Sequence, residues 1–227
     1  MQVAQLDSAG LQDVVTEPDV PTIAVLVYNY AAVSPGVLAD TEAEAARVYL
    51  RAGIRIEWLD CPLTPNDAVQ FPMCHIVGPT ALVLRILPPS MSEHIRQANE
   101  SIGLAMLPED GSFAIVANVF WYDAKRLADR HGMRYGLVLG HIAAHEIGHL
   151  LLGPGSHSLQ GIMRAPWRPN DLYIMAGRSM LFTPSEASRM RTNIRARCAR
   201  NCRMWDVSTT PPANRSTPEI QWVKDAA

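Results

Sequence analysis

The sequence has no excess of charge of one sign and no long uninterrupted apolar segment. Its 227 residues carry a formal net charge of −2. This near-neutral balance argues against a nucleic-acid partner, because phosphate binding requires a basic surface. A run of about 18 uncharged apolar residues is missing, so we expect no membrane span. Because 48% of the residues are hydrophobic, we expect a folded globular protein rather than a disordered chain.

A secretory signal is also missing from residues 1–20, which we expect to be a flexible N-terminal lead. None of the four cysteines has the C-x2-C spacing of a structural zinc site. Cys61 and Cys74 flank a short proline-containing loop and are candidates for a disulfide, with two reduced thiols as the alternative. Cys198 and Cys202 are four positions apart on an expected helix, close to the upper limit for a bridge, so we expect free thiols. A disulfide favours a secreted or periplasmic protein whose leader is absent from this sequence, with the cytoplasm as the alternative.

Hydrophobic periodicity predicts five strands and several helices. We expect strands over residues 22–30, 54–59, 81–87, 102–107 and 113–120, and helices over 34–53, 122–130, 134–152 and 183–199. This order indicates an α/β (α+β) fold with a twisted, mixed, mostly parallel sheet, a crossover helix, a long central helix and a C-terminal helix. We expect one domain over residues 21–205, with an upper part (21–152) and an irregular lower part (153–205). Residues 206–227 read as a loose tail.

The clearest chemical signal is His145-Glu146-x-x-His149 in the longest expected helix. Four helical residues turn about 400°, so both imidazoles lie on one side and reach one ion at about 2.0–2.1 Å. Glu146 projects beside them, where its carboxylate can deprotonate a water molecule. Chance gives only about 0.01 such matches in a chain of this composition, so the pattern predicts a zinc site. His141 continues the stripe but lies about 12 Å along the helix from His149, so we assign it to the core or to support of the site.

A hydrolytic zinc site needs three protein ligands and one open position. We take His157 as the third ligand, because Gly153 can end the helix and Pro154 prevents its continuation. The residues that follow then return the chain toward the ion. Glu186 is the alternative, since some zinc peptidases take a glutamate from a later helix. Its place in an N-terminal helical turn accounts for it equally as a capping residue.

The motif His-Glu-Ile-Gly-His, a following glycine, a third histidine and then Gly161-Ile162-Met163 resemble the metzincin clan of zinc endopeptidases. The similarity is strongest to the matrixin-like and archaemetzincin-like branches. It implies a zincin-like fold, one catalytic Zn²⁺, and a methionine turn beneath the metal formed by Met163, with Met175 and Met180 as competitors. Carried over by position, the ligands are His145, His149 and His157, and the general base is Glu146.

The spacing departs from the family pattern His-Glu-x-x-His-x-x-Gly-x-x-His. Here the glycine comes one residue later and the third histidine two residues later. We therefore expect Gly153, Pro154 and Gly155 to form a bulge that absorbs the extra length. If they do not, His157 is not a ligand.

The resemblance also implies a peptide or protein substrate bound extended along an edge strand. This maps to Gly103, Leu104, Ala105, Met106 and Leu107, for which an ordinary strand is the alternative. Trp167 and Tyr173 are candidates for the wall of a specificity pocket, or for the core. We expect a monomer.

We therefore expect a zinc-dependent endopeptidase. Three alternatives stay open: a zinc-stabilised peptide-binding module without turnover, another His-Glu-x-x-His hydrolase with Glu186 as third ligand, and a metal-free scaffold. A deformylase-like hydrolase has no support, because neither Cys61 nor Cys74 lies in a Glu-Gly-Cys setting.

Overall fold

The computed structural model describes residues 20–64, 71, 74, 78–93, 95, 101–108 and 113–205, with side chains up to residue 199. Residues 1–19 of the expected N-terminal lead, the expected tail over 206–227 and the side chain of Cys202 lie outside the described residues.

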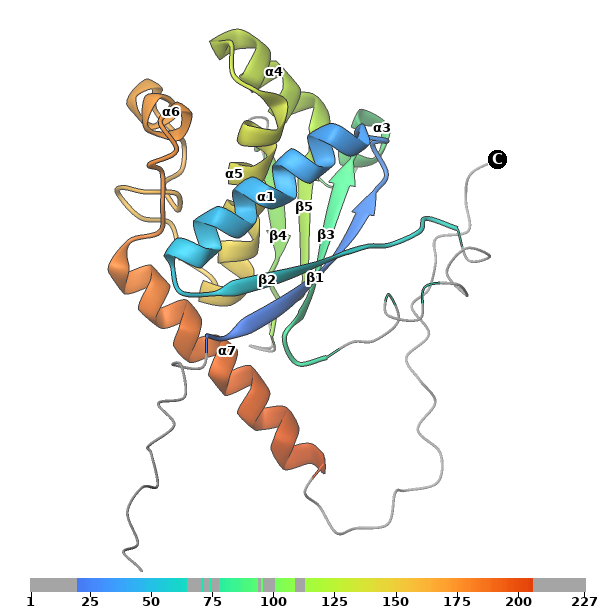
Figure 1. Ribbon diagram of the computed structural model, residues 1–227, viewed down its shortest axis with the longest axis vertical. Helices are drawn as coiled ribbons and strands as arrows, with labels where there is room; N and C mark the ends of the chain where they lie inside the picture. Colours follow the sequence, from blue (N-terminus) through green and yellow to red (C-terminus); the bar gives the residue numbers. More distant parts are fainter. Residues whose placement is uncertain are drawn as a thin grey trace, which may run out of the picture.

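The described strands form a five-stranded sheet in the order β2-β1-β3-β5-β4 (Figure 1). The strands are β1 (Thr22–Asn29), β2 (Arg55–Asp60), β3 (Ala81–Leu87), β4 (Gly103–Met106) and β5 (Val116–Phe120). The helices are α1 (Pro35–Arg51), α3 (Pro89–Ser92), α4 (Trp121–His131), α5 (Tyr135–Leu152), α6 (Pro169–Ala176) and α7 (Pro184–Trp205). Neighbouring strands are parallel except β4, which is antiparallel to β5. The predicted mixed, mostly parallel sheet with helices is confirmed.

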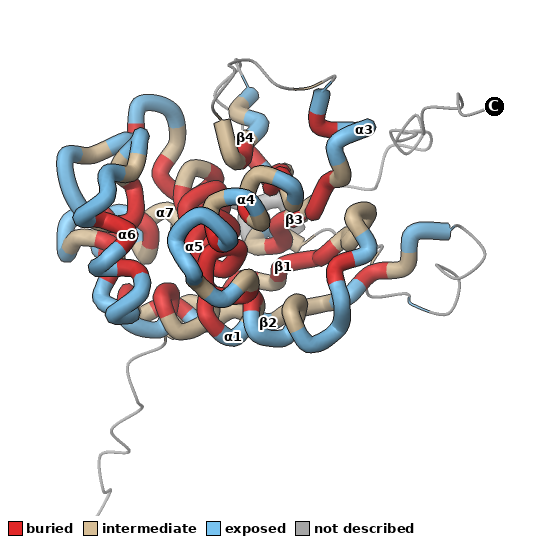
Figure 2. Tube along the Cα trace, turned by 90° about the horizontal axis from the view of Figure 1, so that it is seen from above, coloured by how far each residue is buried: buried red, intermediate tan, exposed pale blue. Residues whose placement is uncertain are grey.

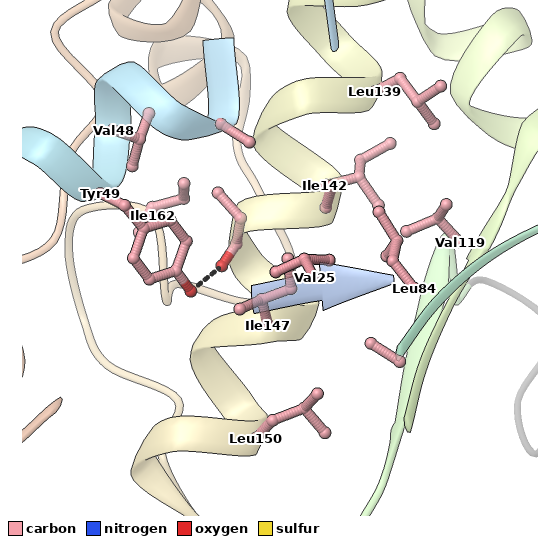
Figure 3. Packing of buried hydrophobic residues seen from close by; sticks show 14 of the residues in the cluster. Val25, Val48, Tyr49, Leu84, Val119, Leu139, Ile142, Ile147, Leu150 and Ile162 are labelled. Atoms are coloured by element: carbon pink, nitrogen blue, oxygen red, sulfur yellow. Dashed lines mark hydrogen bonds between the residues drawn. The ribbon is translucent and has the colours of Figure 1, made fainter. Parts of the chain in front are cut away.

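Alternate residues of the inner strands pack beneath α5, because successive side chains of a strand point to opposite faces. Val25, Leu84 and Val119 come from three different strands and meet Ile142 of α5 in one buried cluster (Figure 3). Tyr49 of α1 is fully buried in this cluster, and its hydroxyl donates a hydrogen bond to the carbonyl oxygen of Ala144, 3.0 Å away. Figure 2 shows α1 and α5 beside the sheet, with buried segments where they face each other. This packing fixes the helix that carries the His-Glu-x-x-His motif.

Helices α1 and α5 approach closely because two glycines of α5 face α1. A Cβ atom placed on Gly136 would lie 2.3 Å from the Cβ of Asp40, and one placed on Gly140 would lie 2.8 Å from the Cβ of Glu44. The glycines are four residues apart, so they occupy one face of α5. The contact leaves no room for a side chain at either position.

The far face of the sheet carries a smaller buried cluster with Leu26, Ala81 and Cys61. Cys61 and Cys74 are joined by a disulfide with a Cα–Cα distance of 5.7 Å. Cys198 is a free, exposed cysteine. Among the described residues, no helix combines the length and apolar character that crossing a membrane requires.

The structure differs from the predicted elements mainly in the lower part. Residues 153–182 were expected to be irregular, but α6 forms within them, beginning with Pro169 at its first position. The backbone N–H of Arg168 donates to the Asp171 carboxylate over 2.7 Å, and Gly177 ends the helix. These start and stop signals are present in the sequence and explain the helix. Strand β5 begins only at Val116, and α3 was not predicted.

Candidate metal centre

Three histidines lie together where α5 ends and the chain turns back. His145 and His149 belong to α5, and His157 follows in the loop. One ring nitrogen from each lies within 4.8 Å of the others, and the Nε2 atoms of His145 and His149 are 3.0 Å apart. Two nitrogen ligands of a tetrahedral zinc ion at about 2.0–2.1 Å are separated by about 3.3 Å. The arrangement therefore fits one ion of this size, with three protein donors.

Hydrogen bonds at Nδ1, across the ring from Nε2, fix the orientation of the His145 and His149 imidazoles. The Nδ1 atom of His145 is 2.7 Å from the carbonyl oxygen of Ile162, and Nδ1 of His149 is 2.8 Å from the hydroxyl of Ser156. A carbonyl oxygen only accepts, so Nδ1 of His145 carries its proton and Nε2 presents a lone pair. Burial lowers the pKa of His145 to about 4 and that of His149 to about 3. Both rings are therefore neutral near pH 7, the form in which imidazole binds a metal.

The loop after α5 accommodates the unusual spacing between His149 and His157. Gly153 has φ +84° and ψ −172°, a conformation open essentially to glycine alone, and Gly155 has φ +66°. Gly153 ends α5 as predicted, but its ψ lies far from the value of a left-handed helical cap, and its N–H donates to the carbonyl oxygen of His149. Farther on, the N–H of Ser158 donates to the carbonyl oxygen of Met163. The reversal brings the ring of His157 to the other two.

Glu146 lies beside the histidines, buried against strand β4. Burial raises the pKa of its carboxyl group to about 8, and hydrogen bonding from the backbone of Ala105 offsets part of this rise. A divalent cation next to the carboxyl group would favour its charged form and lower this pKa. The carboxyl group lines the same cavity as the three histidines.

Met163 is fully buried beneath α5. A Cβ atom placed on Gly148 would lie 2.7 Å from the sulfur of Met163, so the sulfur packs directly on the helix backbone at Gly148, which lies between the two motif histidines in the sequence. Met175 and Met180 are also buried in the core, but neither is among the nearest neighbours of Gly148.

The histidines and Glu146 line a cavity of about 1120 Å³. Its walls come from β4, α5 and the lower part of the chain. Among the residues that line it are Gly103, Leu104, Ala105, Met106, Leu107, Leu127, Ile142, Arg164, Trp167 and Leu172. Tyr173, in contrast, is 79% exposed, so its assignment to the core is wrong, and it is not among the residues that line this cavity.

Trp167 forms part of the cavity wall and contacts a metal-site histidine. Its ring meets that of His145 edge-on, with centroids 5.8 Å apart. Its Nε1–H donates over 3.2 Å to the carbonyl oxygen of Ile162, the same oxygen that accepts from Nδ1 of His145.

Strand β4 forms one edge of the sheet, and its pairing shows which backbone groups are free. The N–H of Phe120 donates to the carbonyl oxygen of Ile102. Hydrogen-bonded pairs alternate with non-hydrogen-bonded pairs in an antiparallel ladder. In the observed register, Gly103 and Ala105 therefore direct their N–H and C=O groups away from β5. The hydroxyl of Ser101 already donates to the carbonyl oxygen of Gly103.

Glu186 and His141 are engaged elsewhere. The Glu186 carboxylate accepts a 2.7 Å hydrogen bond from the N–H of Thr183, whose hydroxyl accepts from the N–H of Glu186. This reciprocal pair is a capping box at the start of α7. His141 is fully buried, with Nδ1 2.9 Å from the carbonyl oxygen of Leu137 and Nε2 3.7 Å from the Glu44 carboxylate.

The sequence did not predict the contact of Ser156 with His149 or the contact of Trp167 with His145. A serine in a loop with two glycines gives no signal of its role in a metal site. Its function follows only from the backbone conformation that places it behind His149.

Comparison with protein-family models gives no match, and comparison with curated proteins gives none either. Among solved structures, the crystal structure of archaemetzincin from Methanopyrus kandleri is similar, with a TM-score of 0.47 and 16% sequence identity. The similarity covers 78% of this chain and 98% of that chain.

Proposed function

We propose that this chain is a zinc-dependent endopeptidase. His145, His149 and His157 hold the ion, and Glu146 acts as general base. The observation that carries the proposal is the convergence of three imidazole nitrogens within 4.8 Å of one another, beside a buried carboxyl group, on the wall of a cavity of about 1120 Å³.

In their neutral form, the three imidazoles are suitable ligands for zinc. Three protein ligands leave a fourth coordination position open. Zinc, when bound there, would polarise a substrate carbonyl and lower the pKa of water toward about 7. Glu146 takes the proton from the attacking water and delivers it to the leaving amine. Ser156 and the carbonyl of Ile162 keep two of the rings in orientation while this occurs.

We further propose that Gly103–Leu107 binds the peptide in extended form. Two features support this role: β4 forms a sheet edge, and its residues line the cavity next to Glu146. The outward N–H of Gly103 and the outward C=O of Ala105 can pair with a peptide by strand addition. Met163 takes the place of the turn methionine of the metzincin resemblance, supported by its buried contact with Gly148.

Metal analysis combined with a cleavage assay tests the proposal. We expect one zinc per chain in the purified protein, and cleavage of a mixed peptide library detected by mass spectrometry. Glu146→Gln should retain the zinc and lose about 10²- to 10⁴-fold in kcat/KM. His157→Ala should lose zinc on dialysis, because two imidazoles remain. Zinc retention with peptide binding but no cleavage by the native chain would instead identify a binding module.

Glu186→Gln separates the two possible third ligands. The amide keeps an acceptor for the N–H of Thr183, so the cap of α7 is preserved. We expect this variant to retain zinc. Loss of zinc from Glu186→Gln, together with retention by His157→Ala, would contradict the proposed ligand set.

We propose an oxidising compartment, periplasmic or extracellular, as the site of function. The disulfide between Cys61 and Cys74 supports it, since such bonds are rare in the cytosol. Thiol titration of protein isolated from its native cells should detect Cys61 and Cys74 only after reduction; two reactive thiols without reduction would contradict this.

A further inference from the structure

Strand β4 touches the Glu146 carboxyl group at a position without a side chain. A Cβ atom placed on Gly103 would lie 2.5 Å from Oε1 of Glu146 and 2.7 Å from both its Cδ and Cγ. All three of the nearest atoms belong to this one side chain. Carbon atoms do not approach so closely, so the carboxyl group occupies the space that any larger residue at 103 would need.

Glycine is otherwise a poor choice for this position. It weakens a strand, and inside a strand it often marks the close approach of another group. The φ of Gly103 is not in the left-handed region, so the backbone conformation does not demand glycine. The contact with Glu146 therefore accounts for the residue.

Two residues farther along the strand, Ala105 provides a second contact. Hydrogen bonding from its backbone reaches Glu146. The ladder with β5 leaves the N–H of Ala105 pointing outward, as expected for a donor available to a group outside the sheet. The carboxyl group of Glu146 is thus positioned by the missing side chain at Gly103 and by the backbone N–H of Ala105, the next residue whose backbone groups point away from β5.

We propose that Gly103 and Ala105 are positioning residues that fix the carboxyl group of Glu146 for proton transfer. The inference rests on the proposed peptidase function, in which Glu146 is the base. The same strand then serves two purposes: the outward N–H of Gly103 and C=O of Ala105 meet the peptide, and the space at Gly103 together with the N–H of Ala105 locates the base. Strand β4 therefore sets the position of the bound peptide relative to the carboxyl group of Glu146.

The variant Gly103→Ala tests the role of the empty space. Its methyl group should push the carboxyl group out of position while leaving the edge N–H and C=O groups of β4 in place. Since misplacement by about 1 Å can cost 10²-fold in rate, we expect kcat to fall about 10- to 100-fold, with KM changed less than about threefold. Zinc content should equal that of the native chain. Gly36→Ala is the matched control, because a Cβ atom there has no neighbour within 4 Å, and it should leave kcat unchanged.

A double-mutant cycle separates positioning from a general loss of structure. Aspartate is one methylene shorter than glutamate, so Glu146→Asp makes room for a methyl group at residue 103. We expect Gly103→Ala to cost less than about threefold in the Glu146→Asp background. A penalty of equal size in both backgrounds, or native kcat in Gly103→Ala, would overturn the inference.

A crystal structure of metal-free Gly103→Ala gives a result independent of activity. It should show the carboxyl group of Glu146 displaced away from residue 103, with β4 unchanged. An undisplaced carboxyl group would overturn the inference. If the native chain binds zinc and cleaves no peptide, the peptidase function fails, and this crystal structure still decides whether Gly103 locates Glu146.

Discussion

The two sides of the candidate metal centre are held in place by different means. On the helix side, α5 carries His145 and His149 and is packed against α1 and the sheet by fully buried side chains and by two glycines without space around them. On the loop side, the chain that carries His157 is shaped by glycines with positive φ, by the contact between the Ser156 hydroxyl and Nδ1 of His149, and by the hydrogen bond from the N–H of Ser158 to the carbonyl oxygen of Met163. The positions of His145 and His149 therefore depend on the hydrophobic core, whereas the position of His157 depends on loop conformation and a few polar contacts.

The largest effect is expected where the helix side has no free space. In Gly140→Val, the new side chain would collide with the backbone carbonyl of Thr41 and with Glu44, each 2.8 Å from the Cβ position. Overpacking of this kind should lower the free energy of unfolding by about 3 kcal/mol or more. Urea denaturation monitored by circular dichroism measures it, and an unchanged midpoint would show that α1 and α5 can move apart.

Gly148→Ala tests the point where the two sides meet. Its methyl group would lie 2.7 Å from the sulfur of Met163 and 3.0 Å from the ring of Phe182. Methionine is adaptable, so we expect a smaller loss of about 1–3 kcal/mol in unfolding free energy. Pairing it with Met163→Ala should recover part of the loss; strictly additive effects would argue against this contact.

Ser156→Ala affects the loop side alone. Removing the hydroxyl frees Nδ1 of His149, and losing such an outer hydrogen bond typically costs 10- to 100-fold in metal affinity. We expect a loss in this range in competition with a zinc chelator, with an unchanged melting temperature for the metal-free protein. Ser158→Ala is the control, because its hydroxyl donates to the carbonyl oxygen of Gln160 rather than to a histidine.

The smallest effect is a pH dependence on the helix side, away from the metal. Burial, reinforced by the nearby Asp60, raises the pKa of Glu42 from 4.5 to about 7. Between these values the folded chain keeps a proton that the unfolded chain has lost, so stability should fall as pH rises through this window. Glu42 is half-buried, which limits the effect to about 1 kcal/mol. In Glu42→Gln, the melting temperature should depend less on pH between pH 5 and 7. If the melting temperatures of the variant and of the native chain change in parallel over this range, Glu42 is excluded as the source.

The helix side was the part that the sequence made predictable. A repeat of 3.6 residues places His145 and His149 on one side of the helix whatever the rest of the chain does, and apolar runs joined by crossovers predict a mixed, mostly parallel sheet, although they do not give the order of its strands. The proximity of Glu146 to Gly103 was not predictable, because it joins residues distant in the sequence through packing. The roles of Ser156 and Gly153 depend on backbone angles that residue types permit but do not specify.

The carbonyl oxygen of Ile162 has a practical consequence for any redesign of the cavity. It accepts hydrogen bonds both from the indole of Trp167 in the cavity wall and from the imidazole of His145. Trimming Trp167 to enlarge the cavity would remove one of its two donors and the edge-on ring against His145. Redesign of the cavity is therefore better begun at Leu127 or Leu172, which line it and whose side chains carry no hydrogen-bond donor to this shared acceptor.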